Sequence, residues 1–137
     1  MCGITGSLGA SSFTPDALAA MAKTLAHRGP DHTGTLFESP VALAMTRLSI
    51  IDLSTGNQPM HSPDGQASLV FNGEIYNYRE LRKELEGKSP FRTTSDTEVI
   101  INGYVVWGEE VFRRLNGIFA VALWDRARKK LLLARDP

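Results

Sequence analysis

Continuous and alternating apolar runs predict β-strands in five parts of the chain. These runs are rich in β-branched residues or leucine, and they are bounded by the glycine, proline, asparagine or aspartate residues that end strands. They span residues 2–8, 41–52, 67–73, 117–125 and 129–136. The second run is expected to leave its strand and enter a turn. The last two are separated by a short polar turn and therefore predict a β-hairpin.

Apolar residues at three- and four-residue spacing predict helices between these strands. Thr14 followed by Pro15 is typical of a helix start, and the periodic pattern after it ends near His27. A second helix is expected after Asn77, which can cap it while Glu80 reaches back to the cap.

Two further helices follow in the second half of the chain. Ser95 and Glu98 have the S-x-x-E spacing of a capping box, so Ser95 is expected to begin the third helix. A short fourth helix fits residues 109–115. Because strands and helices follow one another in groups, with no repeated βαβ unit, the order favours an α+β fold over a doubly wound parallel sheet.

Two polar segments predict loops. Residues 27–34, HRGPDHTG, are rich in turn-forming residues, and residues 54–65, STGNQPMHSPDG, form the most loop-like stretch of the chain. A loop as long as the second is more often functional than idle in a compact domain. No glycine-rich loop with phosphate-binding spacing follows any predicted strand.

Composition narrows the class of protein. The 137 residues are 42% hydrophobic and 22% charged, which is ordinary for one globular domain and excludes a disordered chain. The 15 basic and 15 acidic residues balance, so neither a nucleic-acid partner nor an anionic membrane surface is indicated. No apolar run is long enough to span a bilayer and no signal peptide is evident, so we expect a cytoplasmic protein.

Metal sites and disulfides are not expected either. The single cysteine, Cys2, has no internal partner for a disulfide. The three histidines, His27, His32 and His61, do not have the spacing of metal ligands, and we expect them to be hydrated or hydrogen-bonded at the surface.

Cys2 becomes the N-terminal residue if the initiator methionine is removed. Its α-amine, with an ordinary pKa of about 7.7 to 8.0, could then accept the thiol proton, so that one residue would act as both nucleophile and base. The alternative is that Cys2 is a small hydrophobic residue in a buried strand. Position alone favours the alternative.

Other residues could complete such a site, although each has a simpler explanation. Asn72 and Gly73 offer a side-chain amide and a backbone N–H to an oxyanion, but Asn-Gly between two apolar runs is also a strong hairpin signal. Glu74 could hold an amine or be a hydrated strand residue. Arg47 could bind a carboxylate or form a surface ion pair. Asp96 could bind a cation or simply favour a helix N-terminus.

Seven separated segments together resemble one family, the glutaminase domain of glutamine-hydrolysing asparagine synthetases. In chain order these segments are MCGITG, HRGPDHTG, RLSIIDLSTGNQPM, FNGEIYNYRELR, SDTEVI, LNGIFAVALWD and LLLARDP. The resemblance covers residues 1–137 as a glutamine amidotransferase type 2 domain. It implies an α+β N-terminal nucleophile (Ntn) hydrolase fold, with four αββα layers and two antiparallel sheets.

The resemblance also implies a reaction, the hydrolysis of L-glutamine to glutamate and ammonia, with a role for each candidate residue. Cys2 would be the nucleophile, and Asn72 and Gly73 would form the oxyanion hole. Arg47 would bind the substrate carboxylate, with backbone groups of Leu48 and Ile50 lining the site. Glu74 and Asp96 would hold the substrate α-amino group.

The resemblance further implies a longer parent enzyme. Members of the family continue beyond this point with additional strands and an ATP-pyrophosphatase synthetase domain, so the domain is expected to be incomplete at its C-terminus. That synthetase domain is the expected partner, and ATP and magnesium are expected there, with no cofactor in this chain. A different ammonia acceptor, or a catalytically silent regulatory or interaction module, stays open, as does the oligomeric state.

Overall fold

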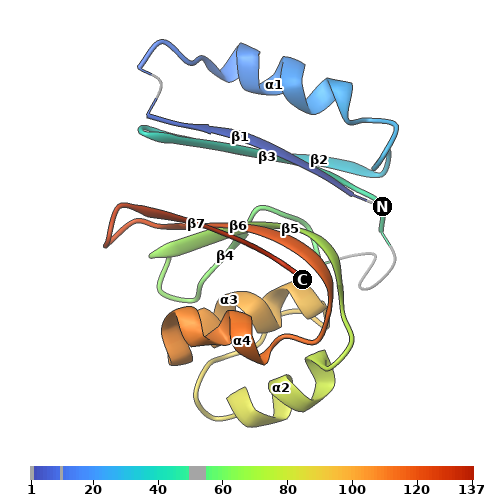
Figure 1. Cartoon of the computed structure of the whole chain (residues 1–137), viewed down its shortest axis with the longest axis vertical. Coiled ribbons are helices and arrows are strands. Elements are labelled where there is room, and N and C mark those ends of the chain that lie inside the picture. Colours follow the sequence, from blue (N-terminus) through green and yellow to red (C-terminus); the bar gives the residue numbers. More distant parts are fainter. Residues whose placement is uncertain (1, 10, 50–54) are drawn as a thin grey trace.

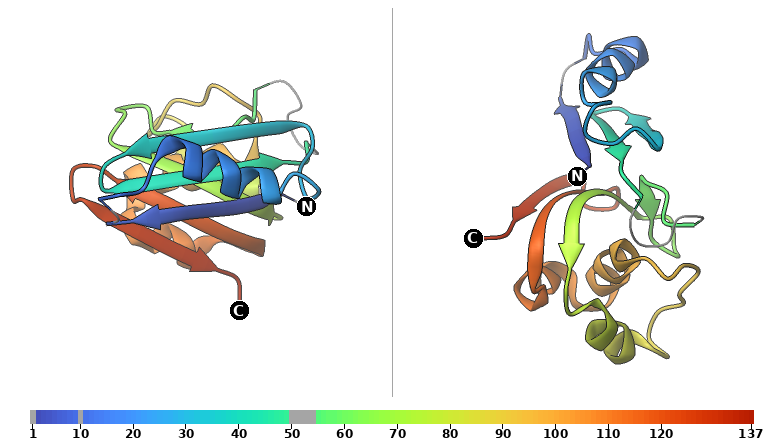
Figure 2. Two further views of the ribbon diagram at one scale, coloured as in Figure 1. Left: turned by 90° about the horizontal axis from the view of Figure 1, so that it is seen from above. Right: turned by 90° about the vertical axis from the view of Figure 1, so that its right-hand side faces the viewer.

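The protein consists of four layers in a computed structural model that describes residues 2–9, 11–49 and 55–137. Helix α1 (Pro15–Thr24) covers one three-stranded sheet, which packs on a four-stranded sheet. Helices α2 (Tyr78–Leu85), α3 (Asp96–Trp107) and α4 (Val111–Arg114) cover the far side of the second sheet (Figures 1 and 2). The predicted α+β architecture of four αββα layers with antiparallel sheets is confirmed.

The first sheet has the strand order β1-β3-β2. Its strands are β1 (Gly3–Leu8), β2 (His32–Glu38) and β3 (Val41–Arg47). Strand β3 is central, and each of its seven residues is buried. The predicted loop over residues 27–34 is wrong in its last three positions, because His32 already pairs with Arg47. No apolar run predicts strand β2, because most of its side chains are exposed or only partly buried, and backbone pairing with β3 holds it in place.

The second sheet has the order β4-β5-β6-β7. Its strands are β4 (Met60–His61), β5 (Ala67–Ile75), β6 (Gly117–Asp125) and β7 (Lys130–Arg135). The last two form the predicted hairpin. Asn72 and Gly73 do not make a turn, because they pair with Ala120 and Phe119 inside the ladder between β5 and β6. The hairpin interpretation of this Asn-Gly pair is therefore wrong.

The helices begin close to the predicted positions. They are α1 (Pro15–Thr24), α2 (Tyr78–Leu85), α3 (Asp96–Trp107), the short 3-10 helix η1 (Gly108–Glu110) and α4 (Val111–Arg114). The Thr14 side chain accepts a hydrogen bond from Ala17 N, and the Ser95 side chain accepts one from Thr97 N, so both predicted caps are confirmed.

Two predicted capping contacts are replaced by tertiary ones. Asn77 makes no side-chain cap. Its Nδ2 donates a hydrogen bond to Arg114 O, and its Oδ1 accepts one from Asn116 N, so the side chain fixes α2 to the segment before β6. The Glu98 carboxylate accepts bonds from the backbone N–H groups of Arg92 and Thr93, so it orders the loop before α3 and does not complete a capping box.

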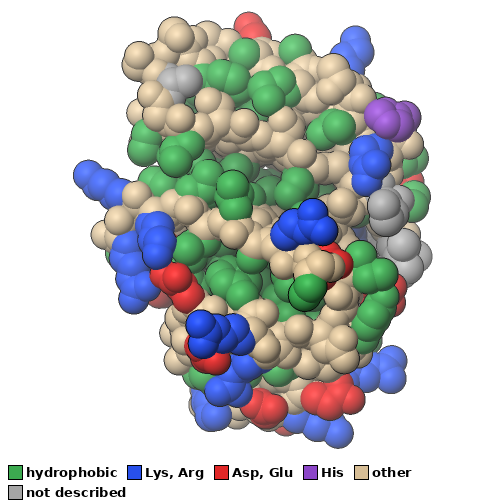
Figure 3. Space-filling view, in the orientation of Figure 1, with side chains coloured by type: hydrophobic (Ala, Val, Ile, Leu, Met, Phe, Trp, Pro, Cys, Tyr) green, Lys and Arg blue, Asp and Glu red, His purple; other side chains and the backbone are tan. Residues whose placement is uncertain are grey.

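Among the described residues, three apolar cores hold the layers together, and the smallest of them joins α1 to β3 through Leu18, Ala22, Ala42 and Ala44. The other two involve the second sheet. One lies between the sheets and includes Met45, Val70 and Trp124; the other lies between the second sheet and its helices. At one end of the seam between the sheets, the Glu38 carboxylate accepts hydrogen bonds from Trp124 Nε1 at 2.6 Å and from Arg126. An apolar groove of about 230 Å³ also follows this seam between β1 and β7, and Figure 3 shows hydrophobic side chains gathered along it.

Candidate active site

A cavity of about 170 Å³ brings together residues from six separate segments. They come from the N-terminus before β1, the end of β3, the loop before β4, the second half of β5, the start of α3 and the start of β6. Seven of the eight predicted site residues line it: Cys2, Arg47, Leu48, Asn72, Gly73, Glu74 and Asp96. The eighth, Ile50, lies outside the described residues.

Cys2 is half-buried at the cavity wall. Leu48 N donates a hydrogen bond to its Sγ atom at 3.3 Å, and Sγ lies 3.7 Å from Leu48 O. Arg28 Nε donates to the Cys2 carbonyl oxygen at 3.0 Å, which fixes the backbone of the residue. The thiol also touches the core between the sheets. Cys2 is therefore packed as a small apolar residue would be, yet its sulfur faces the cavity and accepts an N–H.

Arg47 is buried beside the thiol. Its side chain is 4% exposed, and Nη1 donates a hydrogen bond to Asn57 Oδ1 at 3.0 Å. Arg47 is therefore not a surface residue, as the alternative interpretation required. Asp31 supports the same strand end, because its backbone N donates to Arg47 O and its carboxylate accepts from Ser49 N. A buried guanidinium on a cavity wall suits a bound carboxylate, because it can offer two parallel N–H donors.

The backbone of β5 directs a row of N–H groups toward the cavity. Alternate residues of a strand direct their N–H groups to the same edge. Phe71 N donates to Gln58 Oε1 at 2.6 Å, and Ile75 N donates to Asp96 Oδ2 at 2.9 Å, so these two N–H groups use one edge. Gly73 lies between them, and the same alternation directs its N–H to that edge.

The Asn72 side chain lies on the opposite face of β5 from Phe71. Val70, two residues earlier, belongs to the core between the sheets, to which Cys2 also belongs. Side chains two residues apart share a face of a strand. The Asn72 amide is thus on the face of β5 that looks toward Cys2, as a side-chain oxyanion donor requires.

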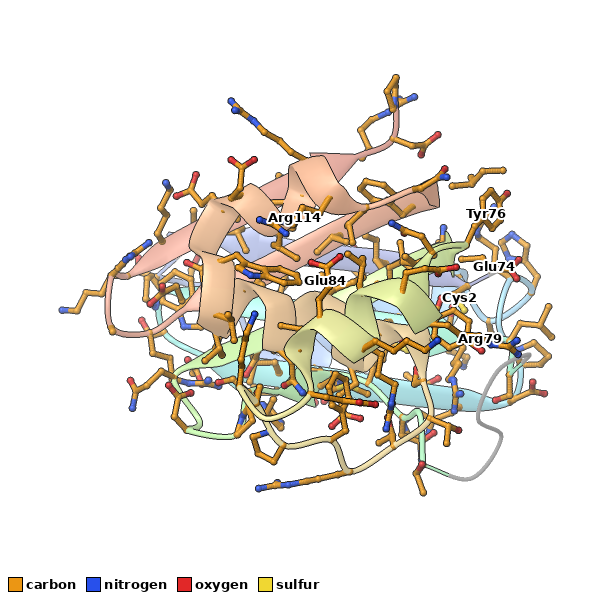
Figure 4. All side chains as sticks on the ribbon, turned by 90° about the horizontal axis from the view of Figure 1, so that it is seen from below. Cys2, Glu74, Tyr76, Arg79, Glu84 and Arg114 are labelled. Atoms are coloured by element: carbon orange, nitrogen blue, oxygen red, sulfur yellow. The ribbon has the colours of Figure 1, made fainter. Side chains whose placement is uncertain are left out.

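Two carboxylates, those of Glu74 and Asp96, also line the cavity. Asp96 is 5% exposed at the start of α3, whereas Glu74 is exposed. Burial raises the pKa of Asp96 above its ordinary value, and the charge of Glu74 raises it further, although the Ile75 and Thr97 N–H groups oppose both effects. Figure 4 shows Glu74 and Tyr76 at the same end of the molecule as the Cys2 sulfur. A bound cation would relieve the repulsion between these carboxylates.

Sequence reasoning missed some cavity residues. Gln58, Tyr76, Thr97 and Ile118 also line it. The length of the loop over residues 54–65 was the signal available for Gln58, but that signal did not single out a residue.

The described residues contain no group of three or more His, Cys, Asp or Glu side chains suited to a metal ion. Within the same part of the chain, no helix has the length and apolar character needed to cross a membrane.

The family model of the glutamine amidotransferase domain matches residues 1–137. The chain belongs to this family. This glutamine amidotransferase domain is 41% identical, over 143 aligned positions, to the asparagine synthetase [glutamine-hydrolyzing] 1 of Bacillus subtilis, and the alignment covers 100% of the chain and 23% of that relative. It is also 41% identical to a probable asparagine synthetase [glutamine-hydrolyzing] of Schizosaccharomyces pombe, with 92% and 22% covered. The domain thus spans less than a quarter of the length of these curated relatives.

A solved structure confirms the fold. The glutamine phosphoribosylpyrophosphate amidotransferase from B. subtilis, complexed with ADP and GMP, superimposes with a TM-score of 0.73 at 22% identity. The match covers 99% of the amidotransferase domain and 37% of that chain. The predicted Ntn-hydrolase fold is therefore confirmed. The predicted membership of the glutamine amidotransferase family is confirmed by the match over residues 1–137.

Proposed function

We propose that this domain hydrolyses glutamine to glutamate and ammonia through a thioester on Cys2, and that the ammonia serves ATP-dependent asparagine synthesis from aspartate in a longer parent enzyme. The observation that carries the proposal is the shared cavity of the thiol, Arg47, Asn72, Gly73 and the two carboxylates. The names of the relatives support glutamine as substrate and asparagine as product.

The charges of the cavity match a zwitterionic amino acid. Among the described residues that line it, Arg47 supplies the positive charge and Glu74 and Asp96 supply negative charge. In the proposed complex, the carboxylate of the substrate pairs with the Arg47 guanidinium. The α-ammonium group of the substrate lies against the carboxylates of Glu74 and Asp96. The substrate amide then extends toward Cys2, with its carbonyl oxygen at Asn72 and Gly73.

The proposed chemistry requires removal of Met1, which frees the α-amine of Cys2. The thiol proton passes to this amine, and Sγ forms a bond to the amide carbon of glutamine. The Asn72 amide and the Gly73 N–H stabilise the oxyanion of the tetrahedral intermediate. The bond between the amide carbon and its nitrogen then breaks. The α-ammonium group of Cys2 returns its proton to the leaving nitrogen, and ammonia departs. A glutamyl thioester remains on Cys2.

Hydrolysis of the thioester completes the cycle. The α-amine takes a proton from water as the water oxygen attacks the thioester carbon, and the carbon–sulfur bond breaks. The sulfur recovers the proton, glutamate is released, and the domain needs no cofactor for this half of the reaction. The synthetase domain of the parent is the proposed acceptor of the ammonia, and the ATP and magnesium chemistry belongs to that domain.

The test is ammonia release from glutamine by protein whose loss of Met1 has been verified by intact mass. We expect release by the wild-type chain and none above background by Cys2→Ala. A glutamine-like electrophile should modify Cys2 stoichiometrically. A folded, Met1-free protein with an inert thiol and no ammonia release would refute the proposal and favour the silent module.

A further inference from the structure

Gln58 is a buried amide on the cavity wall to which the proposed mechanism gives no role. It lies in the loop before β4, and 5% of its surface is exposed. Its two polar atoms contact two different layers. Oε1 accepts a hydrogen bond from Phe71 N on β5 at 2.6 Å, and Nε2 donates to Thr97 Oγ1 on α3 at 3.5 Å.

The two contacts of Gln58 adjoin both halves of the site. Phe71 directly precedes Asn72, and its N–H lies on the edge of β5 to which the Gly73 N–H is also directed. Thr97 directly follows Asp96 at the start of α3. One side chain therefore connects the strand that carries the oxyanion donors with the helix that carries the ammonium-binding carboxylate.

The length of β4 explains why a side chain is needed here. Strand β4 pairs with β5 only at Leu69 and Ser68, so it ends before it reaches Phe71. The side-chain oxygen of Gln58, Oε1, takes the place of the backbone acceptor that a longer β4 would offer to Phe71 N. Without it, a buried N–H would lose its partner and this edge of β5 would lose a fixed point.

The Gln58 loop is itself held from two other sides. A Cβ atom added at Gly34 on β2 would overlap the backbone carbonyl oxygen of Gln58 and lie 2.7 Å from the backbone carbonyl carbon. The β2 backbone therefore packs directly on the loop. The preceding residue, Asn57, accepts the hydrogen bond from Arg47. Adjacent amides of one loop thus contact the proposed carboxylate-binding, oxyanion-binding and ammonium-binding elements.

We propose that Gln58 is a positioning residue that, together with the direct hydrogen bond from Ile75 N to Asp96 Oδ2, sets the distance between the oxyanion donors on β5 and the Asp96 carboxylate on α3. This inference rests on the proposed glutaminase function and deepens it. Gln58 acts on bound glutamine through Phe71 and Thr97. Its Phe71 contact controls the geometry of the transition state, whereas its Thr97 contact controls substrate binding.

Two variants separate the two contacts. Gln58→Met keeps the length of the side chain and removes both hydrogen bonds, so we expect kcat/KM for glutamine to fall on the order of tenfold to a hundredfold, with kcat reduced, because small displacements of catalytic donors are costly. Thr97→Val keeps the shape of the threonine and removes only the second contact. We expect it to raise KM about threefold to fivefold with kcat nearly unchanged.

The controls exclude a general loss of structure. Gln66→Met makes the same substitution at an exposed position outside the cavity and should leave both constants unchanged. Alkylation of Cys2 by iodoacetamide, which does not need the oxyanion donors or the charged clamps, should proceed at the wild-type rate in Gln58→Met. An altered alkylation rate together with a lost thermal transition would indicate unfolding, and Thr97→Val then decides the question.

The outcomes distinguish the two proposals. Wild-type kcat and KM in both Gln58→Met and Thr97→Val would overturn the positioning role while leaving the glutaminase proposal intact. A wild-type chain that lacks Met1 and binds glutamine in calorimetry without releasing ammonia would overturn the glutaminase proposal. In that case the glutamine affinities of the two variants still test Gln58, because affinities equal to that of the wild type would refute its link to the binding site.

Discussion

Gly73→Ala should destabilise the protein far more than a glycine substitution in a turn. Gly73 lies inside β5 with φ of 147°, a backbone conformation that favours glycine. A Cβ atom there would collide with the Ile118 carbonyl oxygen and lie 2.7 Å from Phe119 Cα on the neighbouring strand. Both neighbours are backbone atoms of the central pair of strands, so the methyl group can be accommodated only if β5 and β6 separate.

The expected magnitude combines two contributions. A residue held in a sparsely populated backbone conformation costs about 1–3 kcal/mol, and overpacking a well-packed region costs about 1–3 kcal/mol more. The sum, roughly 2–6 kcal/mol, is a large part of the 5–15 kcal/mol that stabilises a typical domain. It corresponds to a fall in Tm on the order of 10 °C for a chain of this size. If Asn72 and Gly73 formed a hairpin turn, the cost would be only about 1 kcal/mol.

The assay is urea unfolding followed by tryptophan fluorescence, with two matched glycine variants. Gly65→Ala isolates the backbone strain, because φ is 72° and an added Cβ meets nothing within 4 Å. Gly6→Ala isolates the collision, because its φ is outside the left-handed region and the Cβ would lie 2.5 Å from Ala42 O. We expect Gly73→Ala to lose the most stability. A loss no larger than that of Gly65→Ala would refute the reasoning.

Three further predictions follow from buried or catalytic groups. Burial and the charge of Glu74 raise the pKa of folded Asp96, so the wild-type protein loses stability as pH rises through that pKa. Asp96→Asn should therefore be more stable than the wild type at neutral pH, and this gain should vanish in acid. The same variant should lose glutamine binding. Equal gains at both pH values in urea titrations would contradict this. Asn72→Ala should lower kcat for ammonia release roughly 10²–10³-fold with little change in KM, and a change confined to KM would contradict an oxyanion role. Glu38→Ala removes the carboxylate that accepts hydrogen bonds from Trp124 and Arg126 between the sheets. The free energy of unfolding, measured with urea, should fall by about 2–4 kcal/mol, and by less in Glu38→Gln. Equal losses in the two variants would contradict a stabilising role of these hydrogen bonds.

Local sequence patterns predicted most of the secondary structure because the relevant signals are local. Thr14 and Ser95 cap helices as their positions indicate, since each needs only a backbone N–H two or three residues away. The signals failed where a distant partner competes successfully. Asn77 bonds the segment before β6, and Glu98 bonds the preceding loop. Strand β2 pairs with β3 along its whole length, although only one of its seven residues is fully buried.

The candidate site was predictable as a set of residues but not as a geometry. Each residue had an ordinary explanation when taken alone, and the resemblance of seven segments to one family gave the set a common purpose. The burial of Arg47, the edge of β5 shared by Phe71 and Ile75, and the bridge through Gln58 depend on contacts between segments that are far apart in the chain. Residue spacing carries no information about such contacts.

The sequence by itself determined the helix starts, the final hairpin and the chemical groups available to the domain, including its single thiol. Only the tertiary structure decided that Asn72 and Gly73 belong to a strand and that the thiol, the guanidinium and the carboxylates line one cavity. The physical reason is that a turn preference of about 1 kcal/mol is a local effect, whereas the ladder between β5 and β6 adds many backbone hydrogen bonds and buries an apolar face on each side. That pairing directs the N–H of Gly73 toward the cavity.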